Sequence, residues 1–252
     1  MHKVYTTPGG KVCCLFKDML SRPHLLIAGA TGSGKSVLEN GLICTVLRDS
    51  IPGRDAAFIL IDTKRVELSP YKDLPHVWYY ADSPQSAVSA LQYALTICEN
   101  RYSDMQRRCL RLYDGGKLYI FIDEFADLMT TAARQVKPLI QRIAQIGRGA
   151  RVMLICCTQT PIAKVIPTEI KCNFDCRVGL RARSAQDSRN ILGYSGLENL
   201  PQYGQGVYLT PEADELYEIP YIDEREQHEL IAYWMDQKKQ ATKPRFLRWL
   251  GL

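Results

Sequence analysis

The residues Gly29-Ala30-Thr31-Gly32-Ser33-Gly34-Lys35-Ser36 constrain the fold of this chain more than any other part of the sequence. They match the phosphate-binding pattern G-x-x-x-x-G-K-S, which requires a strand directly before it and a helix directly after it. The apolar run 25–28 precedes the match, and apolar residues at helical spacing follow it: Val37, Leu38, Leu42, Ile43 and Val46. We therefore expect a strand, a phosphate-binding loop and a helix in that order.

The chemistry of this loop predicts that it binds ATP together with Mg²⁺. Its glycines let the backbone curl so that N–H groups converge on phosphate oxygens, and the helix N-terminus adds the positive end of its dipole. Lys35 is expected to reach the β- and γ-phosphates, and the Ser36 hydroxyl is expected to ligate Mg²⁺. The residues expected to hold the nucleotide are Gly29, Ala30, Thr31, Gly32, Ser33, Gly34, Lys35, Ser36 and Val37.

Further short apolar runs indicate that the loop belongs to an α/β fold. Each is rich in branched or aromatic residues and is bounded by polar or turn residues: 58–61, 118–122, 152–157 and 176–180. Most are almost continuously apolar, which is typical of strands buried on both faces of a parallel sheet.

Amphipathic stretches between these strands predict helices. One begins at Ser83-Pro84, where serine caps the helix and proline takes its first position; a second lies around 136–143. Near the end of the chain, Asp223-x-x-Glu226 resembles a capping box at the start of a third. Alternating strands and helices predict a mostly parallel central sheet flanked by helices.

Length and composition favour one globular domain. The chain has 252 residues, 46% hydrophobic and 23% charged, which excludes a disordered chain, a collagen and a disulfide-rich mini-protein. Its formal charge of +5 is too mild to identify a partner. No internal repeat or linker divides the sequence, so we expect a single domain over residues 1–240 and a basic, aromatic tail over residues 241–252.

The sequence also predicts a cytoplasmic protein without a membrane segment. No apolar stretch approaches the roughly 18–20 residues needed to span a bilayer, and the start MHKVYTTPGG lacks the apolar core of a signal peptide. The chain has 9 cysteines, an odd number, and contains no C-x-x-C pair, which fits reduced thiols rather than a disulfide framework.

An acidic pair, Asp123-Glu124, follows the strand expected at 118–122. Because α/β sheets present ligand groups at the carboxyl ends of their strands, we expect Asp123 to complete the Mg²⁺ shell and Glu124 to polarise the attacking water. Taken alone, the pair is as consistent with a cap on the next helix. The phosphate loop favours the catalytic interpretation, and a glutamate beside the metal ligand points to a hydrolase rather than a kinase.

Gln159, in Thr158-Gln159-Thr160-Pro161, follows the end of the strand expected at 152–157. An amide at this position can bond the γ-phosphate or the attacking water, and so report hydrolysis to the segment that follows. By itself a glutamine at a strand end is weak evidence, because it is more often a loop residue with its own polar partners.

Several longer blocks make the chain resemble the FtsK/SpoIIIE family of DNA translocase motors. They extend over about residues 10 to 238 and comprise 23–29, 61–69 with Leu74-Pro75-His76, 99–102, 122–129 and 187–192. The run Asp123-Glu124-Phe125-Ala126-Asp127-Leu128-Met129 is particularly characteristic. The resemblance implies a RecA-like P-loop motor ATPase that assembles as a homo-oligomeric, hexameric ring around double-stranded DNA and hydrolyses ATP at subunit boundaries.

The resemblance also implies roles for individual residues. The family's nucleotide and hydrolysis motifs match Lys35, Ser36, Asp123, Glu124 and Gln159. Arg148 stands where an arginine finger enters the neighbouring subunit's site, which would make hydrolysis depend on assembly. Arg148 also fits a surface arginine at a helix C-terminus, and Arg151 and Arg189 are alternatives for the finger.

The chain departs from the family pattern at several points. Thr63 stands in place of the usual proline after Asp62, Thr160 stands in place of the usual arginine after Gln159, and the segment between Met105 and Leu118 is shorter. The sequence also lacks the membrane-spanning N-terminus and the C-terminal winged-helix module of the chromosomal motors. We therefore expect a minimal motor from a plasmid, phage or integrative element, or a fragment of a longer chain.

Two other functions remain open. Related motors drive protein secretion with the same ATP chemistry, and a nucleotide-binding module can lock an assembly without turnover. The intact Lys35, Asp123 and Glu124 argue against the second alternative. Basic residues modestly favour nucleic acid over peptide: Lys164, Lys171, Arg177, Arg181, Arg183 and Arg189. The interpretation we favour is ATP-driven translocation of double-stranded DNA.

Overall fold

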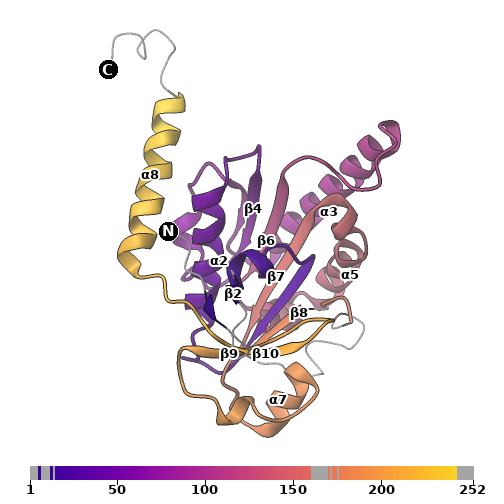
Figure 1. Cartoon of the computed structure of the whole chain (residues 1–252). Coiled ribbons are helices and arrows are strands. Elements are labelled where there is room, and N and C mark those ends of the chain that lie inside the picture. Colours follow the sequence, from indigo (N-terminus) through magenta and orange to yellow (C-terminus); the bar gives the residue numbers. More distant parts are fainter. Residues whose placement is uncertain are drawn as a thin grey trace.

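The computed structural model of the chain describes residues 5–6, 12–13, 15–159, 170, 172–174 and 176–242. Helices cover both faces of one eight-stranded sheet, and a separate two-stranded ladder joins β1 (Tyr5–Thr6) to β2 (Val12–Cys13) (Figure 1).

The large sheet has the strand order β10-β9-β8-β3-β7-β6-β4-β5. Its parallel part comprises β3 (His24–Ala28), β4 (Ala56–Ile61), β5 (Val77–Ala81), β6 (Lys117–Ile122), β7 (Val152–Thr158) and β8 (Cys176–Gly179). The antiparallel strands β9 (Gln205–Leu209) and β10 (Asp214–Glu218) extend it beyond β8. The expected mostly parallel sheet is confirmed, and β3, which precedes the phosphate loop, lies between β7 and β8.

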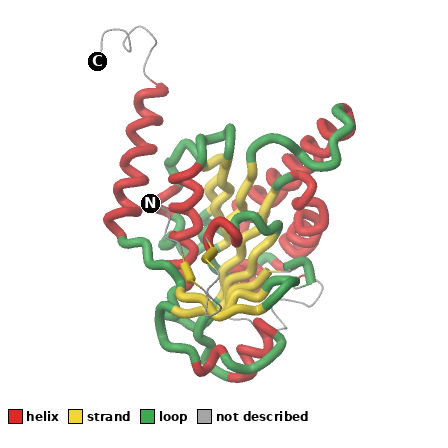
Figure 2. The backbone as a smooth tube through the Cα atoms, in the orientation of Figure 1, coloured by secondary structure: helices red, strands yellow, loops and turns green. Residues whose placement is uncertain are grey.

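The central strands are apolar throughout because their two faces enter two different cores. Every residue of β4 is buried: Ala57, Ile59 and Ile61 lie in one core, and Phe58 and Leu60 lie in the other. The first core contains α3 (Pro84–Arg107), α4 (Phe125–Thr131) and α5 (Ala133–Ala150), and the second contains α1 (Leu15–Met19) and α2 (Lys35–Asp49). Figure 2 shows the helices on the two sides of the strands.

Two of the predicted helix starts can be compared directly with the structure. At α3, the Ser83 hydroxyl accepts from the Ser86 backbone N–H, and Pro84 takes the first helical position, as expected. At α8 (Glu224–Thr242), Asp223 Oδ1 accepts from the Glu226 backbone N–H at 2.7 Å. The Glu226 carboxylate, however, forms an ion pair with Arg48 of α2. The glutamate of the expected capping box therefore joins α8 to α2.

Helix α8 lies beside the C-terminal end of α2 and reaches beyond the sheet (Figure 1). Trp234 packs partly buried against the second core, and its ring N–H donates to the Leu47 carbonyl oxygen at 2.8 Å. None of the helices in the described residues combines the length and the apolar composition that crossing a bilayer requires. The division at residue 240 remains a prediction, and residues 243–252 of the expected tail lie outside the described residues.

A third, small core fixes the segment that follows β8. It contains Ala182, α7 (Ala185–Leu192) and the short helix η2 (Leu197–Asn199), and it includes Ala28 at the end of β3. The other short helix, η1 (Ser69–Tyr71), lies between β4 and β5. The third core therefore holds residues 180–200 close to the start of the phosphate loop.

Candidate nucleotide-binding site

The phosphate loop connects the carboxyl end of β3 to α2. Its glycines are needed for two reasons, backbone conformation and space. Gly32 and Gly34 have φ angles of 72° and 95°, in the left-handed region that side chains rarely adopt. At Gly29 the requirement is space, because a Cβ there would lie 2.6 Å from Ser33 Oγ and 2.8 Å from Leu180 Cβ. The loop is thus packed against the end of β8 as well as curled on itself.

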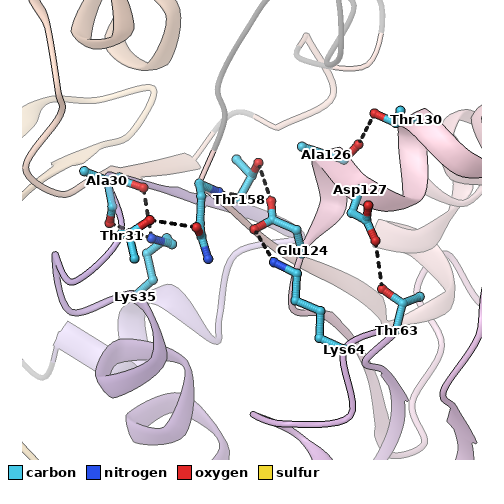
Figure 3. Close-up of polar contacts among 12 residues, drawn as sticks. Ala30, Thr31, Lys35, Thr63, Lys64, Glu124, Ala126, Asp127, Thr130 and Thr158 are labelled. Atoms are coloured by element: carbon cyan, nitrogen blue, oxygen red, sulfur yellow. Dashed lines mark hydrogen bonds and ion pairs between the residues drawn. The ribbon is translucent and has the colours of Figure 1, made fainter.

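Lys35 begins α2, and its side chain turns back over the loop. Its Nζ donates to the carbonyl oxygens of Gly29 at 2.9 Å and Ala30 at 2.7 Å (Figure 3). Burial lowers the pKa of Lys35, while the nearby carboxylates of Glu124 and Asp123 act in the opposite direction. The ammonium group is therefore held at the loop by backbone oxygens.

A cavity of about 440 Å³ lies against the loop, a volume in the range of small-molecule binding sites. Its lining comes from distant parts of the chain: Thr31, Gly32, Gly34, Lys35, Ser36, Val37, Lys64, Val66, Glu67, Asp123, Gln159 and Tyr203. Four residues given chemical roles from the sequence, Lys35, Ser36, Asp123 and Gln159, thus border one space.

Asp123 follows β6 in a strongly acidic environment. Burial and the nearby carboxylates of Asp62, Glu67 and Glu124 raise the pKa of Asp123 to about 6, although Lys64 acts in the opposite direction. A divalent cation would relieve this concentration of negative charge.

The donor set fits Mg²⁺ that arrives with phosphates. The Ser36 hydroxyl and the Asp123 carboxylate are oxygen ligands, which Mg²⁺ prefers. Within the described ranges, no group of three or more His, Cys, Asp or Glu residues has the geometry to hold a metal ion. Because Mg²⁺ usually takes one or two protein carboxylates and completes its shell with water and substrate phosphates, two protein oxygens are sufficient here.

The Glu124 carboxylate is buried and held at both oxygens. Its Oε1 accepts from the Thr158 hydroxyl and from the Gln159 backbone N–H, both at 3.1 Å. Its Oε2 lies 3.3 Å from Nζ of Lys64, in the loop after β4 (Figure 3). Glu124 makes no side-chain cap to α4, which disfavours the interpretation of this residue as a helix cap.

Another carboxyl group, that of Glu39, lies one helical turn beyond Lys35. It is fully buried, and burial together with the Asp123 carboxylate raises the pKa of Glu39 well above its usual range. Burial and the neighbouring charge thus both disfavour the ionised form of Glu39. Glu39 carries no signal in the sequence, because an acidic residue in a helix is normally on the surface.

Three more residues at or near the cavity were given no role at the nucleotide site from the sequence. Lys64 pairs with Glu124, and its place just after a buried strand was an available signal. The Tyr203 ring is 64% exposed at the cavity wall. Arg183 was expected only as one of the basic residues that favour nucleic acid, but its Nη2 donates to Thr31 Oγ1 at 3.2 Å.

Arg148 does not lie with the other predicted site residues of its own chain. It is exposed near the C-terminal end of α5, and it lines a second cavity of about 670 Å³ with Arg22, Lys117 and Arg151. Its guanidinium forms no hydrogen bond or ion pair with the described residues. Arg148 is therefore available to a group outside this chain.

The two alternative fingers differ from Arg148 in their surroundings. Arg151 caps α5 in a left-handed conformation with φ 53°, and its Nη1 donates to the Gly115 carbonyl oxygen at 3.3 Å. Arg189 is exposed on α7. Arg151 thus has a structural contact within the chain.

Among the described members of the basic residues that favour nucleic acid, Arg177 has a structural role. Arg177 donates to the backbone carbonyl oxygens of Phe174 and Ile191, both at 3.2 Å, so it is not a free cation for nucleic acid. Lys164 and Lys171 lie outside the described residues, as does Thr160. Thr63, in place of the family's proline, donates to Asp127 Oδ2 at 3.3 Å (Figure 3).

Comparison with known sequences gives a family match over most of the chain. The profile of the FtsK/SpoIIIE family matches residues 9–117 and 116–163. DNA translocase FtsK of Chlorobaculum tepidum (strain ATCC 49652 / DSM 12025 / NBRC 103806 / TLS) is 38% identical over 227 residues, which are 81% of this chain and 28% of that protein. The chain spans less than a third of the length of the curated relatives it matches.

Two solved structures share the fold at 20% sequence identity. The pCW3 conjugation coupling protein TcpA, in its monomer form with ATPγS, gives a TM-score of 0.77 over 92% of this chain and 70% of that one. The cytoplasmic domain of the Thermomonospora curvata type VII secretion ATPase EccC gives 0.71 over 92% and 30%. The expected α/β P-loop ATPase fold is therefore confirmed.

Proposed function

The chain belongs to the FtsK/SpoIIIE family, and from that premise we propose that it hydrolyses ATP to move double-stranded DNA, acting as a homo-oligomeric ring, with a hexamer as the expected form. The observation that carries the proposal is the Glu124 carboxylate, which is buried and fixed by three donors next to Asp123. A module that only binds nucleotide has no use for a fixed carboxylate at this point.

The residues divide the chemistry among themselves. The loop's N–H groups and Lys35 bind the phosphates, and Ser36 with Asp123 holds the Mg²⁺, which neutralises phosphate charge when bound. Glu124 orients and polarises the attacking water, and the Gln159 backbone keeps that carboxylate in position. Arg148 of a neighbouring subunit stabilises the charge of the transition state.

Tyr203 is the residue we assign to the nucleobase. Tyr203 is the one aromatic residue among the described residues that line the cavity, and it is exposed. Aromatic rings bind bases by stacking, which contributes about 1–3 kcal/mol in nucleic-acid complexes. This assignment supports a nucleotide rather than a simple polyphosphate as the ligand.

DNA is favoured over a secreted protein as the cargo. The relatives above 30% identity are named DNA translocases, and Arg181 and Arg189 leave exposed positive charge beyond β8. Protein secretion is the alternative, because the EccC likeness has a TM-score similar to that of TcpA and the fold alone does not discriminate between them. The origin in a plasmid, phage or integrative element and action in the cytoplasm remain parts of the proposal.

The test is steady-state ATP hydrolysis by the full chain, with and without duplex DNA, at two salt concentrations. DNA should stimulate hydrolysis, and its affinity should fall steeply with salt without strong sequence preference, because the contacts are to phosphates. Glu124→Gln serves as the control for contaminating hydrolysis. Turnover that ignores DNA at both salt concentrations would overturn the assignment of DNA as cargo, and absence of turnover would overturn the assignment of an enzyme.

A further inference from the structure

The segment after β8 runs directly against the phosphate loop. The Ala30 backbone N–H donates to the Arg181 carbonyl oxygen at 2.8 Å, and the packing of Leu180 leaves no room for a side chain at position 29. At the end of this segment, Arg183 Nη2 donates to the Thr31 hydroxyl oxygen at 3.2 Å. A guanidinium thus lies on the phosphate loop of its own chain.

The backbone that carries Arg183 is fixed on both sides. Ala182 is buried, and its N–H donates to the Leu197 carbonyl oxygen at 3.1 Å. Ser184 caps α7 by accepting from the Asp187 backbone N–H at 3.1 Å. Arg183 itself is exposed, and no carboxylate of the described residues pairs with its charge. A positive charge is therefore held beside the loop without an anion of its own.

Thr31 continues the contact toward the hydrolytic residue. Its hydroxyl donates to Gln159 Oε1 at 2.9 Å, and the Gln159 backbone N–H donates to Glu124 Oε1 at 3.1 Å (Figure 3). Arg183, Thr31, Gln159 and Glu124 thus form a row of residues joined by hydrogen bonds. Its two middle members, Thr31 and Gln159, line the nucleotide cavity. Arg183 does not itself line the cavity, but it contacts Thr31, from which Gln159 leads to Glu124. Glu124 marks the side where the terminal phosphate of a nucleotide is expected to react.

We propose that Arg183 binds the terminal phosphate of the nucleotide in its own subunit, and that the row Thr31, Gln159 and Glu124 couples this contact to hydrolysis. The inference rests on the proposed ATPase function and names a residue by which the site distinguishes ATP from ADP. A guanidinium prefers a charged phosphate oxygen to a neutral hydroxyl. A terminal phosphate therefore draws Arg183 from Thr31, whose hydroxyl is shared with Gln159.

Arg183 and Arg148 have different signatures, because one acts in its own subunit and the other in a neighbour. Loss of Arg183 weakens binding of a nucleotide triphosphate by a dilute, isolated chain. Loss of Arg148 leaves that binding intact and affects turnover after assembly.

The experiment measures the affinities of the full chain for ATPγS and for ADP. Arg183→Gln should lose roughly tenfold or more in affinity for ATPγS, the effect of one charge-assisted hydrogen bond, and less than about twofold for ADP. Arg183→Lys should lie between, because an ammonium keeps the charge without the planar fork. Arg181→Gln is the matched control, since its exposed guanidinium lies two residues earlier in the same loop and should leave both affinities unchanged.

A second variant tests the coupling. Thr31→Val removes the shared hydroxyl and should lower kcat, while the preference for ATPγS over ADP persists because Arg183 remains. Equal losses of ATPγS and ADP affinity in Arg183→Gln, or no loss, would overturn the proposal for Arg183. A wild-type chain that binds neither nucleotide, or binds both without turnover, would instead overturn the proposed ATPase function.

Discussion

Arg148 and Glu124 lie at opposite ends of the strands of the central sheet: Arg148 at their amino ends and Glu124 at their carboxyl ends. Arg148 is near the end of α5, just before β7 begins, and Glu124 accepts from Gln159 just after β7 ends. The 7 residues of β7 lie between the positions of Arg148 and Glu124 along the strand direction. An extended strand of that length spans roughly 20 Å. An arginine side chain does not cover that distance, so Arg148 cannot assist the Glu124 of its own chain.

The first prediction follows from this separation. If Arg148 acts on a neighbouring subunit, ATPase activity per subunit should rise with protein concentration, and Arg148→Ala should bind nucleotide but turn over slowly at every concentration. Mixing inactive Arg148→Ala with inactive Glu124→Gln should restore part of the activity, because some boundaries then combine an intact Arg148 with an intact Glu124. No recovery, despite demonstrated co-assembly, would return Arg148 to the role of a surface charge.

A second prediction separates binding from chemistry at the phosphate loop. Lys35→Ala should abolish tight ATP binding, because the proposed role of Lys35 is to contact the phosphates in the ground state. Glu124→Gln should bind ATP with nearly wild-type affinity and lose turnover by a factor of about 100 or more, since the carboxylate acts on water in the transition state. Equilibrium binding and single-turnover hydrolysis measure the two effects. Wild-type turnover in Glu124→Gln would show that another group activates the water.

The third prediction concerns the proposed contact of Tyr203 with the nucleobase. Tyr203→Ala should weaken ATP binding roughly tenfold, the loss expected for one stacking contact, whereas Tyr203→Phe should retain the affinity because the ring remains. Inorganic triphosphate, which has no base, should bind Tyr203→Ala and the wild-type chain equally. Competition between ATP and triphosphate reports both affinities. A parallel loss of triphosphate binding would mean that Tyr203 supports the loop rather than the base.

A fourth prediction concerns stability and pH. His24 is buried between β7 and α5: its Nδ1 accepts from the Leu154 backbone N–H at 3.1 Å, so its Nε2 carries the proton donated to the Ala144 carbonyl oxygen at 3.0 Å. Burial lowers the pKa of His24 from 6.5 to about 4. Between these values the unfolded chain binds a proton that the folded chain excludes, so the free energy of unfolding must fall as the pH is lowered through this window.

The expected size of the His24 effect is on the order of 3 kcal/mol over the whole window. Denaturant unfolding between pH 7 and pH 5 should show a shallower pH dependence in His24→Gln than in the wild-type chain, together with lower stability at pH 7. His228→Gln, at an exposed histidine, is the control and should keep the wild-type slope. An unchanged slope in His24→Gln would mean that His24 is not the group responsible.

The strands that could be predicted are those buried on both faces. The run 58–61 is apolar at every position because β4 lies inside the sheet. The strands that were not predicted lie toward the edges of the sheet. β5 exposes Trp78, and β10 alternates exposed residues, two of them acidic, with half-buried ones. In such strands one face meets solvent, so the sequence looks mixed or polar, and only pairing with a neighbour defines the element.

In the candidate site, too, some residues could be predicted from the sequence and others could not. The phosphate loop and the pair Asp123-Glu124 are local motifs whose chemistry depends on neighbours in sequence, so the pattern contains the information. The approach of Arg183 to Thr31 depends instead on how β8 and the third core pack, because about 150 residues separate the two in the chain. The sequence does not show toward which part of the fold an arginine in a loop points. The same is true of Tyr203.

The place of β3 in the sheet has a consequence for the order in which the protein folds during synthesis. Leu25 pairs with Ile155 on one side and with Cys176 on the other, both more than about 100 residues later, whereas β4 finds β5 and β6 much sooner. At ribosomal rates of roughly 5–20 residues per second, β3 waits on the order of ten seconds for both neighbours. The phosphate loop is translated early and enclosed late, so competence to bind nucleotide is among the last properties that the nascent chain acquires.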